Sequence, residues 1–209
     1  MPKKTFMNLS EDKKERILNV MIDEFYEHGY ENASISRIVA SAGIAKGSFY
    51  QYFNDKQDMF KYMIDVMRQE KLTYLETISA EEYKNNFFTL LRKLLKGGLA
   101  FLRDHPKQAV IYDRFMASAD EAVKKGVMGE DINASNVFLE KILHERKAAN
   151  ELSSDLDVRF MAHILTSVSL SFGEYFQNQY DDLSKLKDEE YDHIVEQTIK
   201  LFQHGIEKR

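Results

Sequence analysis

The sequence predicts an all-α protein, and three observations support this fold class. Apolar residues recur with a period near 3.6 residues along most of the chain, which is the spacing of one face of an α-helix. The two prolines, Pro2 and Pro106, leave the first hundred residues free of internal helix breakers. No Asn-Gly or Asp-Gly pair, the usual signal of a β-hairpin, occurs. We expect about nine helices.

Composition favours a protein that folds in water. Of the 209 residues, 44% are hydrophobic and 30% are charged, which is ordinary for a globular protein with a sizeable core. No apolar run approaches the ~18 residues of a membrane span, and the start of the chain lacks the apolar stretch of a signal peptide. Without cysteine, the chain forms no disulfide and offers no thiolate ligand. We therefore expect a cytoplasmic protein that does not bind membranes.

The first long helix is expected to end at His28. Ser10 is a typical N-cap, and Glu11 and Asp12 follow it where the helix dipole favours negative charge. Gly29 should stop the helix, because glycine accepts the left-handed conformation without strain. The apolar stripe between these ends consists of Ile17, Leu18, Met21, Ile22 and Phe25.

Two short helices separated by a glycine turn come next. Ser34 is a second candidate cap, and the apolar residues that follow it are Ile35, Ile38, Val39 and Ala42. Gly43 breaks this helix, and Ile44 places an apolar side chain in the turn. Lys46 then opens the second short helix. Two short helices packed on a longer first one predict a helix-turn-helix over residues 34–53.

The rest of the chain is also predicted to be mostly helical. Asn54 can cap a fourth helix, with Gln57 at its third position, and this helix should run to about Leu75. Pro106 suits the first turn of a later helix. Residues 119–131 contain two glycines and are expected to form a loop. The other ranges expected to be helical are 81–104, 106–118, 132–150, 155–179 (opened by Ser154 or Asp155) and 188–207.

A helix-turn-helix reads DNA by placing the start of its second helix in the major groove, which is about 12 Å wide. Lys46, Gly47 and Ser48 suit that position, because the two small residues let the helix come close to the bases. The phenolic hydroxyls of Tyr50 and Tyr52 can reach phosphate or a base edge. These residue types favour a DNA-binding segment.

The net charge of −5 does not by itself favour DNA binding. Residues 1–56 contain eight basic and eight acidic residues, so the remainder of the chain carries the whole negative charge. Within residues 34–56 the balance is three basic residues to one acidic residue. Because salt screens charges beyond about 8 Å, the local balance decides attraction to phosphate. We expect modest non-specific affinity for DNA.

The ordered combination of these residues resembles the N-terminal domain of TetR-family transcriptional regulators. The resemblance covers about residues 10–60 and depends on three stretches and one lysine: Phe25-Tyr26-Glu27-His28-Gly29-Tyr30, Ser34-Ile35-Ser36-Arg37-Ile38-Val39, Ala42-Gly43-Ile44-Ala45-Lys46-Gly47-Ser48-Phe49-Tyr50-Gln51-Tyr52-Phe53, and Lys56. It implies a homeodomain-like three-helix domain over 1–55 and a helical domain for effector binding and dimerisation over 56–209. One departure is Ala45, where many members of the family carry Ser or Thr.

The resemblance also implies roles for individual residues. Ser34, Ser36 and Arg37 would touch phosphate. Lys46 and Ser48 would lie nearest the base edges, with Gly47 allowing close approach. Tyr50, Tyr52 and Lys56 would make backbone or mixed contacts, whereas Phe49 and Phe53 would pack inside the domain.

A TetR-like protein would act as a homodimer on a palindromic operator in double-stranded DNA. It would be a repressor that a small, lipophilic effector releases from DNA. Candidate ligand-binding residues are Phe88, Tyr112, Phe115, Met116, Phe172 and Phe176. A stripe with several small residues predicts the dimer seam: Val158, Met161, Ala162, Leu165, Val168, Ser169 and Phe172, with Ile194, Val195, Thr198, Ile199 and Phe202 as its companion.

Nothing in the sequence supports catalysis or a cofactor. The six histidines are scattered, and the single pair Glu190 and His193 lacks the second motif and the further glutamates of a di-metal site. No phosphate-binding loop or nucleophile elbow occurs. We therefore expect no enzyme and no metal. The alternative is a helical ligand-binding or adaptor module with a vestigial helix-turn-helix, which the neutral N-terminal region and Ala45 keep open.

Overall fold

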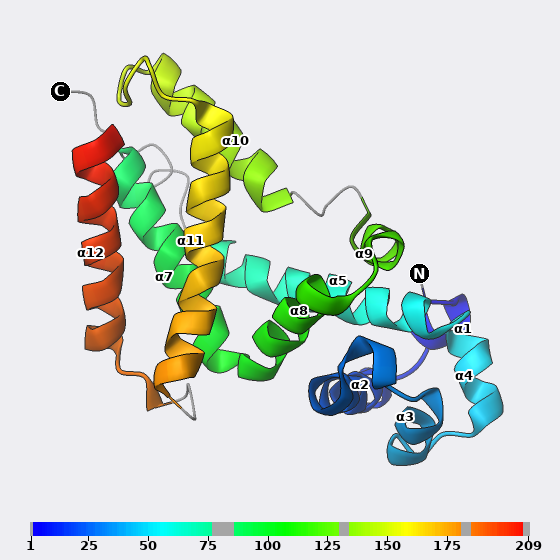
Figure 1. Ribbon diagram of the computed structural model, residues 1–209. Coiled ribbons are helices and arrows are strands. Elements are labelled where there is room, and N and C mark those ends of the chain that lie inside the picture. The colour runs from blue at the N-terminus through cyan, green and yellow to red at the C-terminus, as the bar shows by residue number, and fades with distance from the viewer. Residues whose placement is uncertain (1, 77–85, 130–133, 181–184, 207–209) are drawn as a thin grey trace. The chain divides into compact units, whose positions relative to one another are not determined.

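The structure, a computed structural model, describes residues 2–76, 86–129, 134–180 and 185–206 (Figure 1). Eleven helices form within these ranges, and the predicted all-α fold class is confirmed. Packing divides the chain into two compact units, which are described separately below. The first unit contains Met1–Glu70 and His105–Ile132, and the second contains Lys71–Asp104 and Asn133–Arg209.

The first unit holds the helix-turn-helix and an aromatic core. Its helices are α1 (Lys4–Met7), α2 (Glu11–Asn32), α3 (Ile35–Ser41), α4 (Lys46–Tyr52), most of α5 (Lys56–Glu76), α8 (Pro106–Ser118) and α9 (Glu121–Met128). The ring of Phe60 lies 4.6 Å from that of Phe25 and 4.7 Å from that of Phe115, which joins α2, α5 and α8. All three rings are buried, so apolar burial holds these helices together.

The second unit is a bundle of four described helices: α7 (Phe87–Asp104), α10 (Ala134–Ala148), α11 (Val158–Gln179) and α12 (Asp188–Ile206). Helix α10 packs against α11, and α7 packs against both α11 and α12. The antiparallel pair α7 and α12 is joined by ion pairs along its length: Arg92 with Glu196 at 2.5 Å, Lys96 with Asp192 at 2.6 Å and Arg103 with Asp188 at 2.5 Å.

Several predicted helix boundaries are confirmed. Ser10 and Ser34 are the N-cap residues of α2 and α3, and Pro106 lies in the first turn of α8. Gly29 takes the left-handed conformation with φ at 69°, as expected for a helix stop. The chain nevertheless resumes a helical turn beyond this kink, so that α2 ends at Asn32.

Three local predictions are wrong. Residues 119–131 are not a loop, because α9 occupies most of them and buries Val127 and Met128. The start of α5 is capped by Asp55, which accepts from the amide of Asp58 at 2.7 Å, rather than by Asn54. Helix α11 begins later than expected, after its cap Asp157. Short helix α1 was not predicted at all.

The predicted dimer stripe lies inside the second unit. Val158, Ala162, Leu165 and Phe172 of α11 are buried, as are Val195, Ile199 and Phe202 of α12. These seven side chains fill the core of their own chain and are not available to a partner. The other residues of the stripe, Met161, Val168, Ser169, Ile194 and Thr198, are half-buried, and the seam stays a prediction.

The expected domain boundary between residues 55 and 56 stays a prediction. It follows the motif, whereas packing adds α8 and α9 to the first unit. The first part of the helix expected over 81–104 lies outside the described residues, and α7 accounts for the rest. Among the described residues, none of the helices has the length and apolarity needed to cross a bilayer.

Candidate DNA-binding surface

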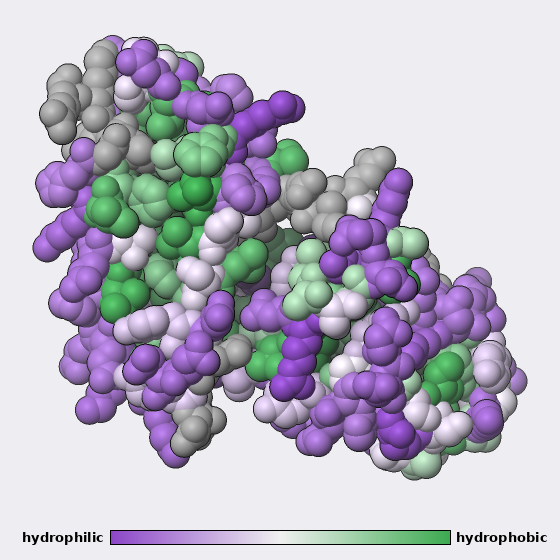
Figure 2. All heavy atoms as spheres, viewed as in Figure 1, coloured by the Kyte–Doolittle hydropathy of each residue, from purple (hydrophilic) through white to green (hydrophobic). Residues whose placement is uncertain are grey.

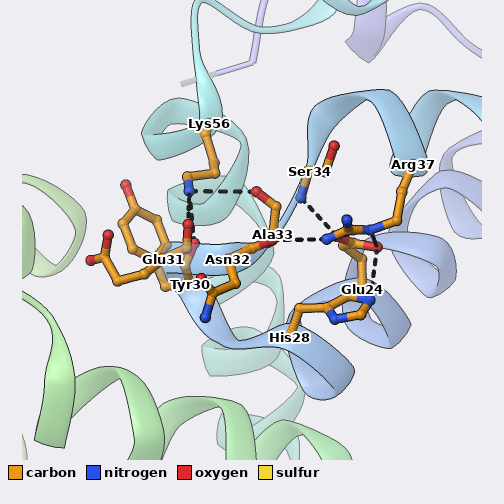
Figure 3. A network of polar contacts seen from close by, with 9 residues as sticks. All are labelled: Glu24, His28, Tyr30, Glu31, Asn32, Ala33, Ser34, Arg37 and Lys56. Carbon is orange, nitrogen blue, oxygen red and sulfur yellow. Dashed lines mark hydrogen bonds and ion pairs between the residues drawn. The ribbon is translucent and has the colours of Figure 1, made fainter.

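A buried carboxylate joins the long helix α2 to α3, the first helix of the helix-turn-helix (Figure 3). Glu24 on α2 is 8% exposed, and its Oε1 accepts from the backbone amide of Ser34 at 2.7 Å. Arg37 on α3 donates to the same carboxylate from Nη2 at 2.6 Å and from Nε at 2.9 Å. Glu24 therefore caps the start of α3 from a neighbouring helix, which Ser34 does not do with its own side chain.

The ionised state of Glu24 follows from these contacts. Burial by itself raises the pKa of Glu24, since it disfavours the charged form. The hydrogen bonds from Arg37 and the Ser34 amide outweigh burial, so the pKa lies below its ordinary value. His28, with Nε2 3.8 Å from Oε2, lowers the pKa further when it is protonated. Glu24 is thus a carboxylate at neutral pH.

Lys56 donates hydrogen bonds to the C-terminal end of α2 (Figure 3). Its ammonium donates to the carbonyl of Tyr30 at 2.8 Å and to that of Glu31 at 2.9 Å. The carbonyl of Ala33 lies at 3.5 Å, and the ammonium sits 4.9 Å from the centre of the Tyr30 ring. A cation at these carbonyls provides hydrogen bonds that they lack within α2, and its charge stabilises the negative end of the helix dipole. Lys56 therefore fixes the start of α5 against α2.

The turn between α3 and α4 has the geometry that its residues predict. Gly43 has φ of 63°, a left-handed conformation that residues with a Cβ rarely adopt. The amide of Ile44 donates to the carbonyl of Val39 at 3.0 Å, and the Ile44 side chain packs against the core of the first unit. Helix α4 then starts at Lys46.

Helix α4 has one buried and one open face. Phe49 and Tyr52 are buried, whereas Lys46, Gly47 and Tyr50 are exposed. A Cβ added to Gly47 would meet no atom within 4 Å, so the space around it is open for a ligand to approach. The exposed residues at the start of a short, anchored helix are those that a major groove can receive.

The structure separates the predicted contact residues by accessibility. Ser36, Lys46, Gly47 and Tyr50 are exposed, and Ser34, Ser48 and Lys56 are half-buried. Arg37 is half-exposed but engaged by Glu24, and Lys56 is engaged by backbone carbonyls. Tyr52 is 7% exposed, and its ring packs edge-on against Phe6 at 5.7 Å.

Some residues that shape this surface were missed in the sequence. Gln51 is exposed on α4 one turn after Gly47, and helical spacing alone would have found it. Glu24 stands beside Phe25 on the buried side of an amphipathic helix, and an acid in that place is a signal of a buried partner. Lys3 and Thr5 also contact α4, but nothing in their local sequence indicates this.

The six candidate ligand-binding residues fall in both units. Phe115 belongs to the hydrophobic core of the first unit, and the partly buried Tyr112 and Met116 pack against that core. The other three, Phe88, Phe172 and Phe176, are buried in the second unit. Their role in ligand binding stays a prediction.

One cavity of about 630 Å³ is open at the surface of the second unit. It lies between α11 and α12, with Phe176 and Ile194 among its apolar walls and Glu190 and His193 among its polar ones. Phe176 is the predicted ligand-binding residue that lines it. No cluster of side chains suited to a metal ion occurs within the described ranges.

Comparison with known proteins agrees with this geometry. Residues 17–63 match the family model described as bacterial regulatory proteins, tetR family. The chain is 26% identical over 177 residues to the uncharacterized HTH-type transcriptional regulator YvdT of Bacillus subtilis, covering 84% of this chain and 86% of that one.

Solved structures share the whole fold. A TetR family transcriptional regulator from Chloroflexus aurantiacus is 29% identical, with a TM-score of 0.78 over 100% of both chains. The regulator FadR of Bacillus subtilis, solved in complex with stearoyl-CoA, is 19% identical with a TM-score of 0.72 over 90% of this chain and 96% of that one. The helix-turn-helix, the family match and the shared fold together show that residues 17–63 form a DNA-binding domain of the TetR type and that the chain is a DNA-binding transcriptional regulator with the fold of TetR family regulators.

Proposed function

We propose that the protein is a cytoplasmic repressor that binds a palindromic operator as a homodimer and leaves it when a small lipophilic effector binds. The observation that carries this proposal is the open face of α4, with Lys46, Gly47 and Tyr50 exposed on a helix pair that Glu24 and Lys56 anchor. Rigid support matters because base recognition needs side chains held close to their binding geometry.

Contacts with DNA divide into two kinds in this proposal. Ser36, Lys46, Gly47, Ser48 and Tyr50 contact DNA directly, with the first residues of α4 nearest the bases. The remaining predicted residues act mainly by holding α3 and α4 in place. The side chains of Arg37, Tyr52 and Lys56 are engaged within the protein, and the backbone amide of Ser34 is held by Glu24.

The dimer is supported by apolar side chains left in solvent on α11 and α12. Leu201 is 73% exposed and Phe160 is 61% exposed, and Leu170 and Tyr175 are also exposed. In Figure 2, hydrophobic and near-neutral residues gather over α11, with hydrophilic residues along the edges of this unit. Soluble proteins rarely leave such a patch uncovered. A two-fold dimer would set two α4 helices about one DNA turn apart, near 34 Å, over a palindrome.

The effector is proposed to bind in the second unit. Its open cavity of about 630 Å³ lies within the usual size range of small-molecule sites and combines aromatic walls with a few polar groups. FadR of Bacillus subtilis, which shares this fold, was solved with stearoyl-CoA, so long-chain acyl-CoA is the first compound class to test. A coupling of about 1 to 3 kcal/mol would change operator occupancy markedly.

An unbiased selection tests the proposal. The full-length protein is used to enrich duplexes from a random library, and enrichment is repeated with stearoyl-CoA and, as a control, with acetyl-CoA. We expect one palindromic consensus, and its loss with the long-chain compound alone. Enrichment without any consensus contradicts operator recognition and supports a helical adaptor with a vestigial helix-turn-helix. A consensus that no lipophilic compound displaces contradicts the effector.

A further inference from the structure

The N-terminal segment donates three hydrogen bonds to the end of α4. The backbone amide of Lys3 donates to the carbonyl of Tyr52 at 2.8 Å, and the Lys3 ammonium donates to the carbonyl of Tyr50 at 2.7 Å. The hydroxyl of Thr5 donates to the carbonyl between them, that of Gln51. Three successive carbonyls at the C-terminus of α4 therefore have partners from a segment more than forty residues away.

These carbonyls need partners because they lie in the last turn of α4, which is also a short helix. The last carbonyls of a helix have no partner within it, and a helix of seven residues is not stable on its own in water. Ala45, the N-cap residue, has no side-chain oxygen to stabilise the other end. The contacts from Lys3 and Thr5 thus stabilise the C-terminal end of a helix whose N-terminal end has no side-chain cap.

An aromatic anchor holds the donating segment in place. Phe6 of α1 is fully buried, and its ring lies 4.8 Å from that of Phe53, 5.0 Å from that of Tyr62 and 5.7 Å from that of Tyr52. Phe53 follows α4 directly and Tyr62 is on α5, so Phe6 bridges the helix that reads DNA and the one that supports it. The positive charge of Lys3 also lies at the negative end of the α4 dipole.

We propose that Lys3, Thr5 and Phe6 form an N-terminal clamp that positions α4 for operator recognition. The inference rests on the proposed function only for its consequence in DNA binding. The clamp lies outside residues 17–63, the part of the chain that matches the family model. Lys3 and Thr5 are positioning residues: they act on DNA affinity through α4, and Lys3 does so as a hydrogen-bond donor to the protein rather than as a phosphate contact.

The clamp is tested first without DNA, by hydrogen exchange of the α4 amides. Lys3→Met and Thr5→Val each remove one side-chain donor, so the amides of residues 50–53 should exchange about fivefold faster in either variant. Thr5→Ser keeps the hydroxyl and should exchange as the unaltered protein does. Lys4→Met is the matched control, since Lys4 is exposed and the substitution changes the charge equally. Unchanged exchange in both Lys3→Met and Thr5→Val overturns the clamp.

The same variants are then titrated with the selected duplex. Lys3→Met and Thr5→Val should each weaken binding about fivefold without a change in the salt dependence of affinity. If Lys3 instead contacted phosphate, its removal would reduce the salt slope by about 0.9 and leave the α4 amides unchanged, which also overturns the clamp. Hydrogen exchange is measured on the free protein. Failure to bind any duplex would therefore overturn the proposed function, but it would not affect the exchange result that tests the clamp.

Discussion

At the scale of single residues, the placement of α3 depends on one buried carboxylate. Glu24 satisfies the amide of Ser34 and holds the guanidinium of Arg37, so it fixes both the start of α3 and a side chain on its outer side. Removing charge from this position leaves the guanidinium without its counter-ion and weakens the cap. The effect of Glu24 on the fold should therefore depend on its ionisation.

Replacing Glu24 by Gln should lower the free energy of unfolding by about 1 to 2 kcal/mol at neutral pH. Its folded-state pKa lies below the unfolded one, so the carboxylate stabilises the fold above about pH 4.3 and loses this effect as pH falls through the folded pKa. Denaturant titration across this range should show the difference between the two proteins shrinking in acid. Glu15→Gln, on an exposed part of α2, is the control. If the difference in the free energy of unfolding between the two proteins did not change with pH, the Glu24 carboxylate would not have the stabilising role described.

Ala45 gives a second prediction at this scale. A serine at this N-cap position can accept from the amides at the start of α4, which adds about 1 kcal/mol to helix stability. We expect Ala45→Ser to slow hydrogen exchange of the α4 amides and to raise the unfolding midpoint in denaturant. Ala40→Ser, an exposed position inside α3, should bring no such gain. Equal effects of the two substitutions would show that the gain does not come from capping.

At the scale of elements, α9 shows how packing outweighs local propensity. Gly126 lies inside it, and a glycine there disfavours a helix by about 1 kcal/mol. Burial of Val127 and Met128 in the core of the first unit supplies the compensation. A Cβ on Gly126 would lie 1.9 Å from Nε2 of Gln57 on α5, so the glycine also permits the two helices to approach.

This contact predicts a coupling between Gly126 and Gln57. In a Gln57→Ala background, Gly126→Ala should stabilise the fold by about 1 kcal/mol, because alanine favours a helix and has room. With Gln57 present, the same substitution should gain less, since the end of the glutamine side chain must move. A double-mutant cycle in denaturant measures the coupling. Additive effects would mean that the close approach is not maintained in solution.

The sequence predicted elements well where one local signal sufficed. The N-cap positions of Ser10 and Ser34, the turn at Gly43 and the proline at the start of α8 each follow from a few neighbouring residues. The structure confirms these positions, although neither serine side chain makes a cap hydrogen bond. Helix α1 has only four residues and depends on Phe6 reaching α4 and α5, so no periodicity reveals it. The predicted dimer stripe shows a related limit: periodicity indicates that a face is buried but not what buries it, and seven residues of the stripe are buried by their own chain.

The same limit applies to the candidate site. The open residues Lys46, Gly47 and Tyr50 follow from helical spacing, as the sequence predicted. Tyr52 belongs to the opposite face of the same helix, and its burial depends on Phe6 of a distant segment. The engagement of Arg37 and Lys56 depends on partners 13 and 26 residues away, which no local pattern contains.

At the scale of the whole molecule, the net charge of −5 and DNA binding are compatible because the charge is unevenly distributed. The first 56 residues are neutral overall, and α4 presents Lys46 without an acidic neighbour inside the helix. The operator therefore has to be recognised through a few local contacts rather than through a general attraction. Two copies of such a surface bind more tightly than one when a dimer presents both to the same DNA.

Leu201 tests the proposed dimer. It is the most exposed of the large apolar side chains identified on α11 and α12, and a charge there would be unfavourable in an apolar interface. Leu201→Glu should shift the protein from dimer to monomer in sedimentation and weaken binding to a palindrome at least tenfold. Leu72→Glu, at an exposed position of α5, should leave both unchanged. A dimer that survives Leu201→Glu would place the interface elsewhere.

Recognition of DNA by the open face of α4 is tested by the affinity of three proteins for the selected duplex, measured over a range of salt concentrations. Compared with the unaltered chain, Lys46→Ala should bind more weakly and lose preference for the selected duplex over a scrambled one. A base-edge contact is worth about 1 to 3 kcal/mol, or roughly five- to 150-fold. Lys141→Ala, an equal change of charge at an exposed position of α10, should bind as the unaltered protein does. Equal binding by Lys46→Ala, with its preference intact, would contradict recognition of DNA by the open face of α4.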